Sequence, residues 1–379
     1  ASSPEGARDY IVPSRKFKGK FYALPQAPQQ YKQLLMVSGF DKYFQIAPCF
    51  RDEDARADRS PGEFYQLDFE MGFATQEDVF RAGEEVLTST FNKFAPEGAS
   101  VTQAPFPVIS YKQAMLEFGC DKPDLRNPLR IMDVTEFFQK CTFKPFLKRT
   151  VRAIKVHAEM SKGFHEKLLS YAQSIGMGGL GYLEIADDMS YKGPIDKFIP
   201  DEYKAELAEL AGLVPGDTIF FIADKEERAN LYAGQLRNEI GKRLDLYEKN
   251  AFRFCFVNDF PMFEYDNEEK KIVFTHNPFS MPQGGLEALN TKNPLDILAY
   301  QYDIVCNGIE LSSGAVRNHD LDIMVKAFEI AGYTQEDLKT KFGALYSAFQ
   351  FGAPPHAGMA PGVDRMIMLL RDEENIREI

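Results

Sequence analysis

The sequence predicts an α+β protein in which antiparallel strand pairs are flanked by helices, with a second α+β domain inserted into the chain. Three observations support this fold class. Residues 43–71 hold two strand patterns around a charged loop. Asn307-Gly308 lies between two apolar runs and is the strongest short signal for a β-hairpin. Helical patterns that begin at Thr75 and Thr334, each followed three residues later by Asp, stand between the strands.

The composition is that of an ordinary globular protein and excludes several classes. The chain has 379 residues, is 44% hydrophobic and carries a net charge of −12, which argues against a general binder of nucleic-acid backbone. No window approaches the roughly 20 apolar residues of a membrane span. The 5 cysteines and 5 histidines show no metal-ligand spacing. We expect reduced cysteines, a cytoplasmic location and no association with membranes.

The first elements along the chain are a strand at Phe21–Leu24 and a helix at Gln29–Val37, with Pro28 in the first turn of the helix. Gln29 and Lys32 are three residues apart, so they share one helix face near the N-terminus. They are either a binding pair or two solvated side chains.

A strand–loop–strand unit over residues 43–73 organises the rest of the chain. The first strand ends at Arg51, and the loop adds Glu53. In the second strand, apolar side chains alternate with a second set, and the members of that second set are Phe64, Gln66, Asp68 and Glu70. If the apolar face packs on a core, this second face is free to form the wall of a cavity. The alternative is a surface hairpin with a solvated polar face.

Residues 112–252 differ in character and indicate an inserted domain, which divides the chain into segments 1–111, 112–252 and 253–379. Short helices, strand-like runs and a long helix at Glu227–Leu246 are expected there. The glycine-rich stretch at 176–181 departs from the G-x-G-x-x-G pattern, so we expect a turn before a strand and not a phosphate-binding loop. No reactive set of residues stands out in this segment.

The third segment supplies the most specific geometry. A two-residue turn at Asn307-Gly308 pairs Val305 with Glu310, and Asp303 shares the face of Val305, so Asp303 and Glu310 are diagonal neighbours. Two adjacent carboxylates favour Mg²⁺, although an exposed, solvent-screened edge is the alternative. His276 lies at the end of another strand, in a polar turn, where it is either structural or part of the site.

Cationic side chains complete the set of candidate site residues. Arg317 follows the hairpin and could place a positive charge in the same cavity. Arg365 lies in the first turn of a helix that begins near Gly362, where free N–H groups attract anions. Arginines, a lysine, paired carboxylates and an aromatic on a strand wall suit the binding of a polyanion with a metal and the orientation of an in-line attack. Nucleotide activation fits this set and peptidase chemistry does not.

Several stretches resemble the catalytic part of the bacterial-type aspartyl-tRNA synthetases, which are class II enzymes. FRDED and GVDR resemble class II motifs 2 and 3, and the segments PEGARDY and LPQAPQQYKQLLM are typical of aspartyl enzymes. EFYQLDFEM and NGIELSSGAVR also match, and the middle segment resembles the inserted domain of the bacterial type. The resemblance covers nearly the whole chain. It implies a class II-like antiparallel sheet and ATP-dependent, Mg²⁺-assisted formation of aspartyl-adenylate, followed by transfer to tRNA.

The resemblance also implies residue roles. Catalysis falls to Arg51, which would hold the α-phosphate and the substrate's α-carboxylate, and to Arg365, which would reach the γ-phosphate and sandwich the adenine with Phe64. The remaining ATP-binding residues implied are Glu53, Ser60, Glu310, Gly362 and Asp364. Lys32 and Arg317 would select the side-chain carboxylate of aspartate over the amide of asparagine. Glu5, Gln29 and Asp68 would surround the α-amino group, His276 would cover the amino acid on a mobile loop, and Asp303 with Glu310 would hold Mg²⁺.

The chain departs from the family pattern in three places. Ser60 stands where Gln is common, Gly62 is unusual, and Asn277 replaces a second His, which puts one ATP contact and one loop contact in doubt. We expect a fragment that lacks the N-terminal anticodon-binding domain and most of motif 1, binds tRNA weakly and has a compromised homodimer. The alternatives are a paralogue of the same fold that activates aspartate or asparagine for another purpose, and a catalytically silent binding module.

Overall fold

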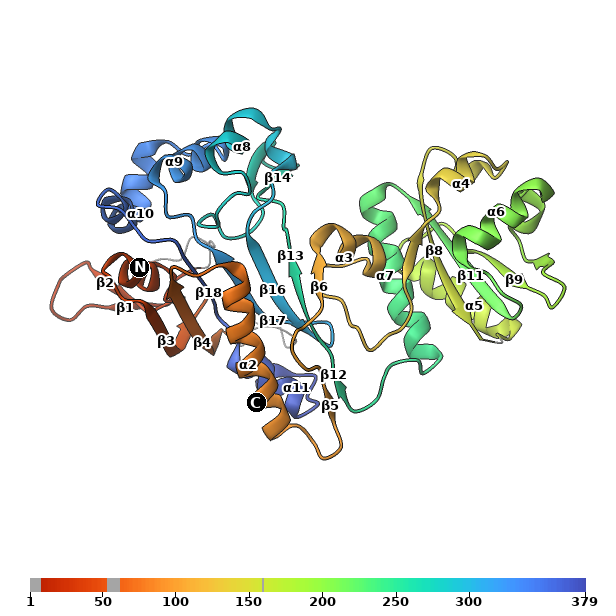
Figure 1. Ribbon diagram of the computed structural model, residues 1–379, viewed down its shortest axis with the longest axis horizontal. Coiled ribbons are helices and arrows are strands. Elements are labelled where there is room, and N and C mark those ends of the chain that lie inside the picture. The colour runs from red at the N-terminus through yellow and green to blue at the C-terminus, as the bar shows by residue number, and fades with distance from the viewer. Residues whose placement is uncertain (1–7, 53–61, 159) are drawn as a thin grey trace. The chain divides into compact units, whose positions relative to one another are not determined.

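A computed structural model describes residues 8–52, 62–158 and 160–379 of the chain (Figure 1). These residues form two compact units: the residues up to Tyr111 together with Phe252–Ile379, and Lys112–Ala251. Both units are α+β, with antiparallel sheets flanked by helices. In the described part of the chain, no helix is long and apolar enough to cross a membrane.

The main sheet of the first unit has, among described residues, seven strands in the order β3-β4-β18-β17-β16-β13-β6. Neighbouring strands are antiparallel except for the parallel pair β6 and β13. The strands are β3 (Lys42–Phe50), β4 (Glu63–Gly72), β18 (His356–Met359), β17 (Ile309–Val316), β16 (Gln301–Cys306), β13 (Phe254–Asn258) and β6 (Val108–Ser110).

Helix α2 (Gln76–Phe94) covers one face of this sheet (Figure 1). Thr75 and Asp78 form the predicted capping box at its start, in which each side chain accepts a hydrogen bond from the backbone N–H of the other residue. Phe80 stacks on Phe256 of β13 with ring centroids 3.7 Å apart, and Phe91 meets Phe254 edge-on at 4.9 Å. Because alternate residues of a strand point to opposite faces, this core leaves the other face of β4 free to line a cavity.

The cavity face is bordered by the remaining helices of the first unit. α9 (Leu321–Ile330) and α10 (Gln335–Phe349) form a second apolar core with Phe279, and α8 (Gly285–Thr291) packs on α9. The other elements of this unit are α1 (Gln29–Val37), α11 (Val363–Leu370), the pair β1 (Ile11–Pro13) and β2 (Phe21–Ala23), the pair β14 (Phe263–Asp266) and β15 (Lys271–Phe274), and the short strands β5 (Ser100–Val101) and β12 (Ala251–Phe252).

The second unit is an antiparallel sheet with helices on both faces. Its strands follow the order β10-β9-β11-β8-β7. Alternate side chains of β8 and β11 face α4 and α6 on one side and α5 and α7 on the other. The elements are α3 (Tyr111–Phe118), β7 (Ile131–Asp133), α4 (Thr135–Gln139), β8 (Thr150–His157), α5 (Lys162–Ser174), β9 (Gly181–Ile185), β10 (Tyr191–Lys192), α6 (Asp201–Ala211), β11 (Asp217–Asp224) and α7 (Glu226–Arg243).

A buried arginine ties this unit together. Arg237 of α7 is 1% exposed and donates hydrogen bonds to the carbonyl oxygens of Leu129, Asp124 and Asn127 at 2.7, 2.9 and 2.8 Å. The Asn127 amide donates back to the Arg237 carbonyl at 3.0 Å. Burial lowers the pKa of Arg237 to about 10, and the guanidinium stays charged at neutral pH.

Most predicted elements are confirmed. The helix over Gln29–Val37, both Thr–Asp capping boxes and the helix that begins after Gly362 have the predicted positions. The glycine-rich stretch leads into β9, as expected. Helices α5 and α6 were not predicted.

Candidate functional site

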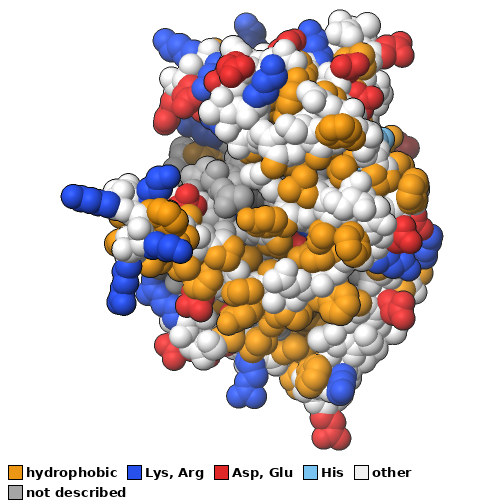
Figure 2. Space-filling model, turned by 90° about the vertical axis from the view of Figure 1, so that its left-hand side faces the viewer, with side chains coloured by type: hydrophobic (Ala, Val, Ile, Leu, Met, Phe, Trp, Pro, Cys, Tyr) orange, Lys and Arg blue, Asp and Glu red, His pale blue; other side chains and the backbone are white. Residues whose placement is uncertain are grey.

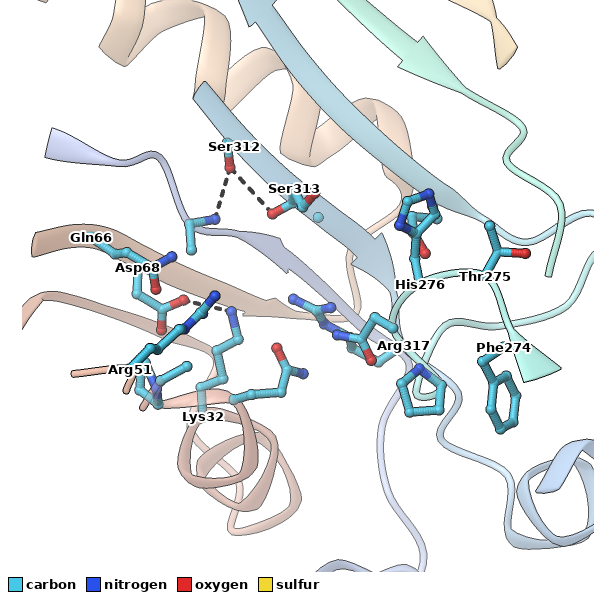
Figure 3. A pocket seen from close by; sticks show the side chains of 18 of the residues that line it. Lys32, Arg51, Gln66, Asp68, Phe274, Thr275, His276, Ser312, Ser313 and Arg317 are labelled. Carbon is cyan, nitrogen blue, oxygen red and sulfur yellow. Dashed lines mark hydrogen bonds and ion pairs between the residues drawn. The ribbon is translucent and has the colours of Figure 1, made fainter. Parts of the chain in front are cut away.

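The first unit contains a cavity of about 1320 Å³ on the face of the sheet opposite α2. Side chains from α1, β4, β17 and the segment after β15 converge on it, as Figure 3 shows. β4 contributes Phe64, Gln66 and Asp68, which are three of the four side chains predicted to form a wall. The fourth, Glu70, lies deeper and has no exposed surface.

Glu70 is held between two cations. Arg317 donates to its two carboxylate oxygens from Nε at 2.9 Å and from Nη2 at 3.1 Å. The Nζ atom of Lys32 is 3.2 Å from Oε2. Burial alone would raise the pKa of Glu70, but Arg317 and then Lys32 outweigh burial and lower it to about 2. Glu70 is therefore ionised and fixes both cations at the base of the cavity.

The two carboxylate oxygens of Asp68 differ in their hydrogen bonding. Its Oδ1 accepts a hydrogen bond from Lys32 at 2.6 Å (Figure 3). Its Oδ2 is buried and has no hydrogen-bond partner among the described residues. Burial raises the pKa of Asp68 in spite of the opposing effect of Lys32. Because a buried carboxylate oxygen is costly to leave without a partner, this atom indicates a site for a cationic donor.

The other end of the cavity combines an aromatic ring with arginines. The Arg51 guanidinium lies 5.1 Å from the centre of the Phe64 ring. Arg365, in the first turn of α11, donates to the Glu310 carbonyl at 2.6 Å and lies 3.7 Å from its carboxylate. Asp364 accepts a hydrogen bond from the Tyr65 N–H at 2.7 Å, which joins the start of α11 to β4. This end suits a planar group next to an anion.

The paired carboxylates lie on the β16–β17 hairpin. Val305 pairs with Glu310 and Cys306 with Ile309, as the Asn307-Gly308 turn predicts. A β-bulge at Leu311 then places Ser313 opposite Asp303. The Ser313 hydroxyl lies 2.5 Å from Asp303 Oδ1 and 3.5 Å from Glu310 Oε1.

This donor set fits Mg²⁺. Mg²⁺ in nucleotide sites takes one or two carboxylates and completes its shell with water and phosphate oxygens. The described residues hold no group of three or more His, Cys, Asp or Glu that could bind a metal, so a metal here would need ligand oxygens from a substrate.

The segment after β15 borders the cavity near Arg317 (Figure 3). His276 lines the cavity and meets the Phe260 ring edge-on at 5.0 Å. The Asn277 side chain accepts a hydrogen bond from the Phe279 N–H at 2.9 Å, which folds this segment into a turn.

Comparison with known proteins places the chain in a family. The model for tRNA synthetases of class II (D, K and N) matches residues 1–379. The chain belongs to this family of class II synthetases. It is 60% identical to an aspartate–tRNA(Asp/Asn) ligase of Ehrlichia chaffeensis and 59% identical to one of Zymomonas mobilis; all of the chain is matched in both, but only 65% and 64% of those proteins. The chain thus spans slightly less than two thirds of the length of these curated relatives.

Solved structures also resemble this chain. One is the aspartyl-tRNA synthetase of Entamoeba histolytica, at 18% identity and a TM-score of 0.47, with 97% of this chain and 52% of that chain covered.

The structure brings together most of the predicted site residues of this chain. Eleven line the cavity: Gln29, Lys32, Arg51, Phe64, Asp68, His276, Glu310, Arg317, Gly362, Asp364 and Arg365. Asp303 lies behind them and reaches the cavity edge through Ser313. Glu5, Glu53 and Ser60 lie outside the described residues. The unusual Gly62 has φ +87°, a conformation that favours glycine, and its carbonyl accepts a hydrogen bond from Arg51 N–H at 2.8 Å.

Several residues that hold the cavity-lining side chains in place through hydrogen bonds were not predicted from the sequence. Glu70 was placed on the cavity face of its strand but received no role. Gln33, Ser313 and His356 were not considered. The signal for Glu70 was present, because a lysine and an arginine expected in one cavity need a counter-charge.

Proposed function

We propose that this synthetase activates L-aspartate with ATP and transfers the aspartyl group to tRNA. An oxygen of the substrate's α-carboxylate attacks the α-phosphorus of ATP, and the bond to the bridging oxygen breaks and releases pyrophosphate. The ribose hydroxyl at the 3′ end of tRNA then attacks the aspartyl carbonyl and displaces AMP. The observation that carries the proposal is the buried Lys32–Glu70–Arg317 cluster beside the unpartnered oxygen of Asp68.

The donors left over in this cluster match aspartate. Arg317 donates to Glu70 from Nε and from one terminal nitrogen. The guanidinium has five N–H groups, so further donors remain for a ligand. Lys32 gives two of its three donors to Asp68 and Glu70. A side-chain carboxylate would take the remaining donors, while the α-ammonium group would reach Asp68 Oδ2. The neutral amide of asparagine would gain less from the two cations.

The opposite end of the cavity provides for ATP. Phe64 and Arg365 would offer two faces for the adenine ring, and Arg51, whose guanidinium lies 5.1 Å from the Phe64 ring, would contact the α-phosphate and the substrate carboxylate. Asp303 and Glu310 would hold Mg²⁺, which supplies charge neutralisation of the phosphates when it is bound. The chain's own contribution is to hold both substrates in line for the attack.

The relatives named above are aspartate–tRNA(Asp/Asn) ligases. We therefore extend the proposal to transfer of aspartate to the tRNAs for both Asp and Asn. Four of the 5 cysteines are buried, which fits the reduced core residues of a cytoplasmic protein and supports that location.

The decisive experiment is ATP–pyrophosphate exchange with Mg²⁺, in which aspartate is compared with asparagine. We expect exchange with aspartate and at most slight exchange with asparagine. Arg317→Leu should lower exchange at least about thirtyfold, because loss of one partner of a buried charge pair costs about 2–5 kcal/mol. Arg371→Leu, at an exposed position outside the cavity, is the matched control. ATP binding by each variant shows that the fold is retained.

Equal exchange with asparagine, or full exchange in Arg317→Leu, would contradict the proposed specificity. Absence of exchange with either amino acid, in a chain that still binds ATP, would favour a binding module.

Although a compromised homodimer is expected from the sequence, we propose that this chain forms a homodimer. β3 is an edge strand of the main sheet, and its side chains Phe44 and Ile46 are 77% and 53% exposed. Exposed apolar side chains of β1 and β2 join them (Ile11, Val12, Phe21 and Tyr22), and Figure 2 shows hydrophobic side chains gathered over this side of the molecule. An apolar surface next to an open sheet edge is typical of a protein interface.

A further inference from the structure

A buried chain of hydrogen bonds runs behind the amino-acid end of the cavity. The side-chain amide of Gln29 donates to Gln33 Oε1 at 3.1 Å. The amide nitrogen of Gln33 lies 3.3 Å from His356 Nε2, and His356 Nδ1 lies 2.8 Å from the Pro354 carbonyl oxygen. Gln29 is 7% exposed, and Gln33 and His356 are fully buried. Of these residues, Gln29 lines the cavity.

The chemistry of the groups fixes the direction of every hydrogen bond. The Pro354 carbonyl can only accept, so the proton of the neutral imidazole is on Nδ1. Nε2 then accepts from the Gln33 amide, which turns the Gln33 carbonyl oxygen toward Gln29. The Gln29 amide nitrogen donates to that oxygen, and its carbonyl oxygen is left on the side of the cavity.

We propose that His356 is a positioning residue which, through Gln33, fixes the orientation of the Gln29 amide toward the α-ammonium group of the amino-acid substrate. The proposal rests on the proposed function of the cavity. It assigns a role to a side chain that contacts no substrate. A carbonyl oxygen aimed at an ammonium group attracts it, whereas a rotated amide would present N–H groups and repel it.

This hydrogen-bond relay, which runs from the Pro354 carbonyl through His356 and Gln33 to Gln29, needs a neutral imidazole. Protonation would turn Nε2 into a donor that faces the Gln33 amide N–H, and Gln33 would have to rotate. Burial lowers the pKa of His356, while Glu70 of β4 raises it, and Arg317 and His319 after β17 lower it. From α1, the uncharged Gln33 contacts the ring, and Lys32 pairs with Glu70. The relay should thus remain intact throughout the ordinary titration range of histidine.

Two substitutions at His356 each remove one of its two hydrogen bonds, so that the effects of the two bonds can be compared. His356→Asn keeps an N–H donor at the place of Nδ1 and loses the acceptor for Gln33. His356→Gln keeps an acceptor at the place of Nε2 and loses the donor to Pro354. We expect His356→Asn to raise the KM for aspartate in pyrophosphate exchange roughly five- to tenfold, the effect of one hydrogen bond, with the KM for ATP unchanged. His356→Gln should stay within about twofold of the unsubstituted chain.

A double substitution tests the connection itself. Gln33→Met should raise the KM for aspartate as much as His356→Asn, and the two together should do no more than either alone, because both break one relay. In the unsubstituted chain, the KM for aspartate should rise only at a pH below the ordinary pKa of histidine. This rise should be absent in His356→Gln.

A readout without substrate separates failure of this inference from failure of the proposed function. ¹⁵N NMR of the His356 ring in the substrate-free chain should show the proton on Nδ1, whichever amino acid the chain activates. A proton on Nε2, or a KM for aspartate that His356→Asn leaves unchanged, would overturn the proposal. A proton on Nδ1 in a chain that neither binds nor activates aspartate would support the relay and refute the proposed function.

Discussion

At Glu70, one carboxylate determines the charge of the whole amino-acid end of the cavity. It accepts hydrogen bonds from Nε and Nη2 of Arg317, and its Oε2 lies 3.2 Å from Lys32 Nζ. Without this carboxylate, the buried Arg317 guanidinium would lose its ion pair and Lys32 would keep only Asp68, which costs several kcal/mol. In the proposed function, Glu70 thereby holds Lys32 and Arg317 in place for the substrate carboxylate.

The low pKa of Glu70 predicts a specific acid sensitivity. Its folded pKa of about 2 is below the unfolded value of 4.5, so its stabilisation is complete above pH 4.5 and is lost as the pH falls toward 2. At neutral pH this contribution is about 3 kcal/mol. Urea unfolding between pH 6 and 2 should show a flatter stability profile for Glu70→Gln than for the unsubstituted chain. Glu63→Gln, at an exposed position of the same strand, should keep the original profile.

The sequence allowed the wall of the cavity to be predicted but not its charge balance. The alternation in β4 placed Phe64, Gln66 and Asp68 on one face, because the period of a strand is local. The partner of Glu70 is 247 residues away in the chain, so only the fold brings Arg317 to it. His356 was missed for the same reason, since Gln33 is 323 residues distant.

At the scale of elements, strand β18 leaves room for the Glu70 carboxylate because it has a glycine at position 358. A Cβ atom on Gly358 would lie 2.2 Å from Glu70 Oε2 and 2.2 Å from the Phe69 carbonyl oxygen. Neither atom can move easily, because one is held by Arg317 and Lys32 and the other belongs to the backbone of β4. The close approach of Glu70 and of the β4 backbone therefore requires glycine at position 358.

Gly358→Ala should accordingly displace Glu70 and damage the site. We expect a loss of about 1–3 kcal/mol in the free energy of unfolding, as for other overpacked cores, and at least a tenfold rise in the KM for aspartate. Gly343→Ala is the control, because a Cβ atom there meets nothing within 4 Å and the residue lies in α10. It should be neutral or stabilising by up to about 1 kcal/mol. Equal stability of the two variants in thermal unfolding would refute this account of Gly358.

Elements with strong local signals were predictable. α2 and α10 carry capping boxes, and Asn307-Gly308 fixed the pairing of the β16–β17 hairpin. The bulge at Leu311 was not predicted, since its position depends on packing across the sheet. α5 and α6 were overlooked, although Pro200 before α6 and Gly212 after it are ordinary helix boundaries.

For the whole molecule, the exposed apolar surface of β1, β2 and β3 leads to a prediction about assembly. Sedimentation velocity should show a particle of twice the chain mass of 43.0 kDa. Phe44→Glu combined with Ile46→Lys should give the single-chain mass, because charges on an edge strand oppose pairing with another chain. Leu210→Glu, which changes a 51% exposed apolar residue of α6 in the second unit, should leave the mass unchanged. A chain that is monomeric without substitution would refute the dimer.

The second unit also has a consequence for how the chain can be shortened. The chain leaves the first unit after β6 and returns to it just before β13, and these two strands are parallel neighbours in the main sheet. The intervening residues therefore act as a crossover connection, which must carry the chain from one end of the sheet back to the other. A tight turn could not replace them. Excision of the second unit would require a linker of about a dozen residues or more, long enough to run the length of the strand.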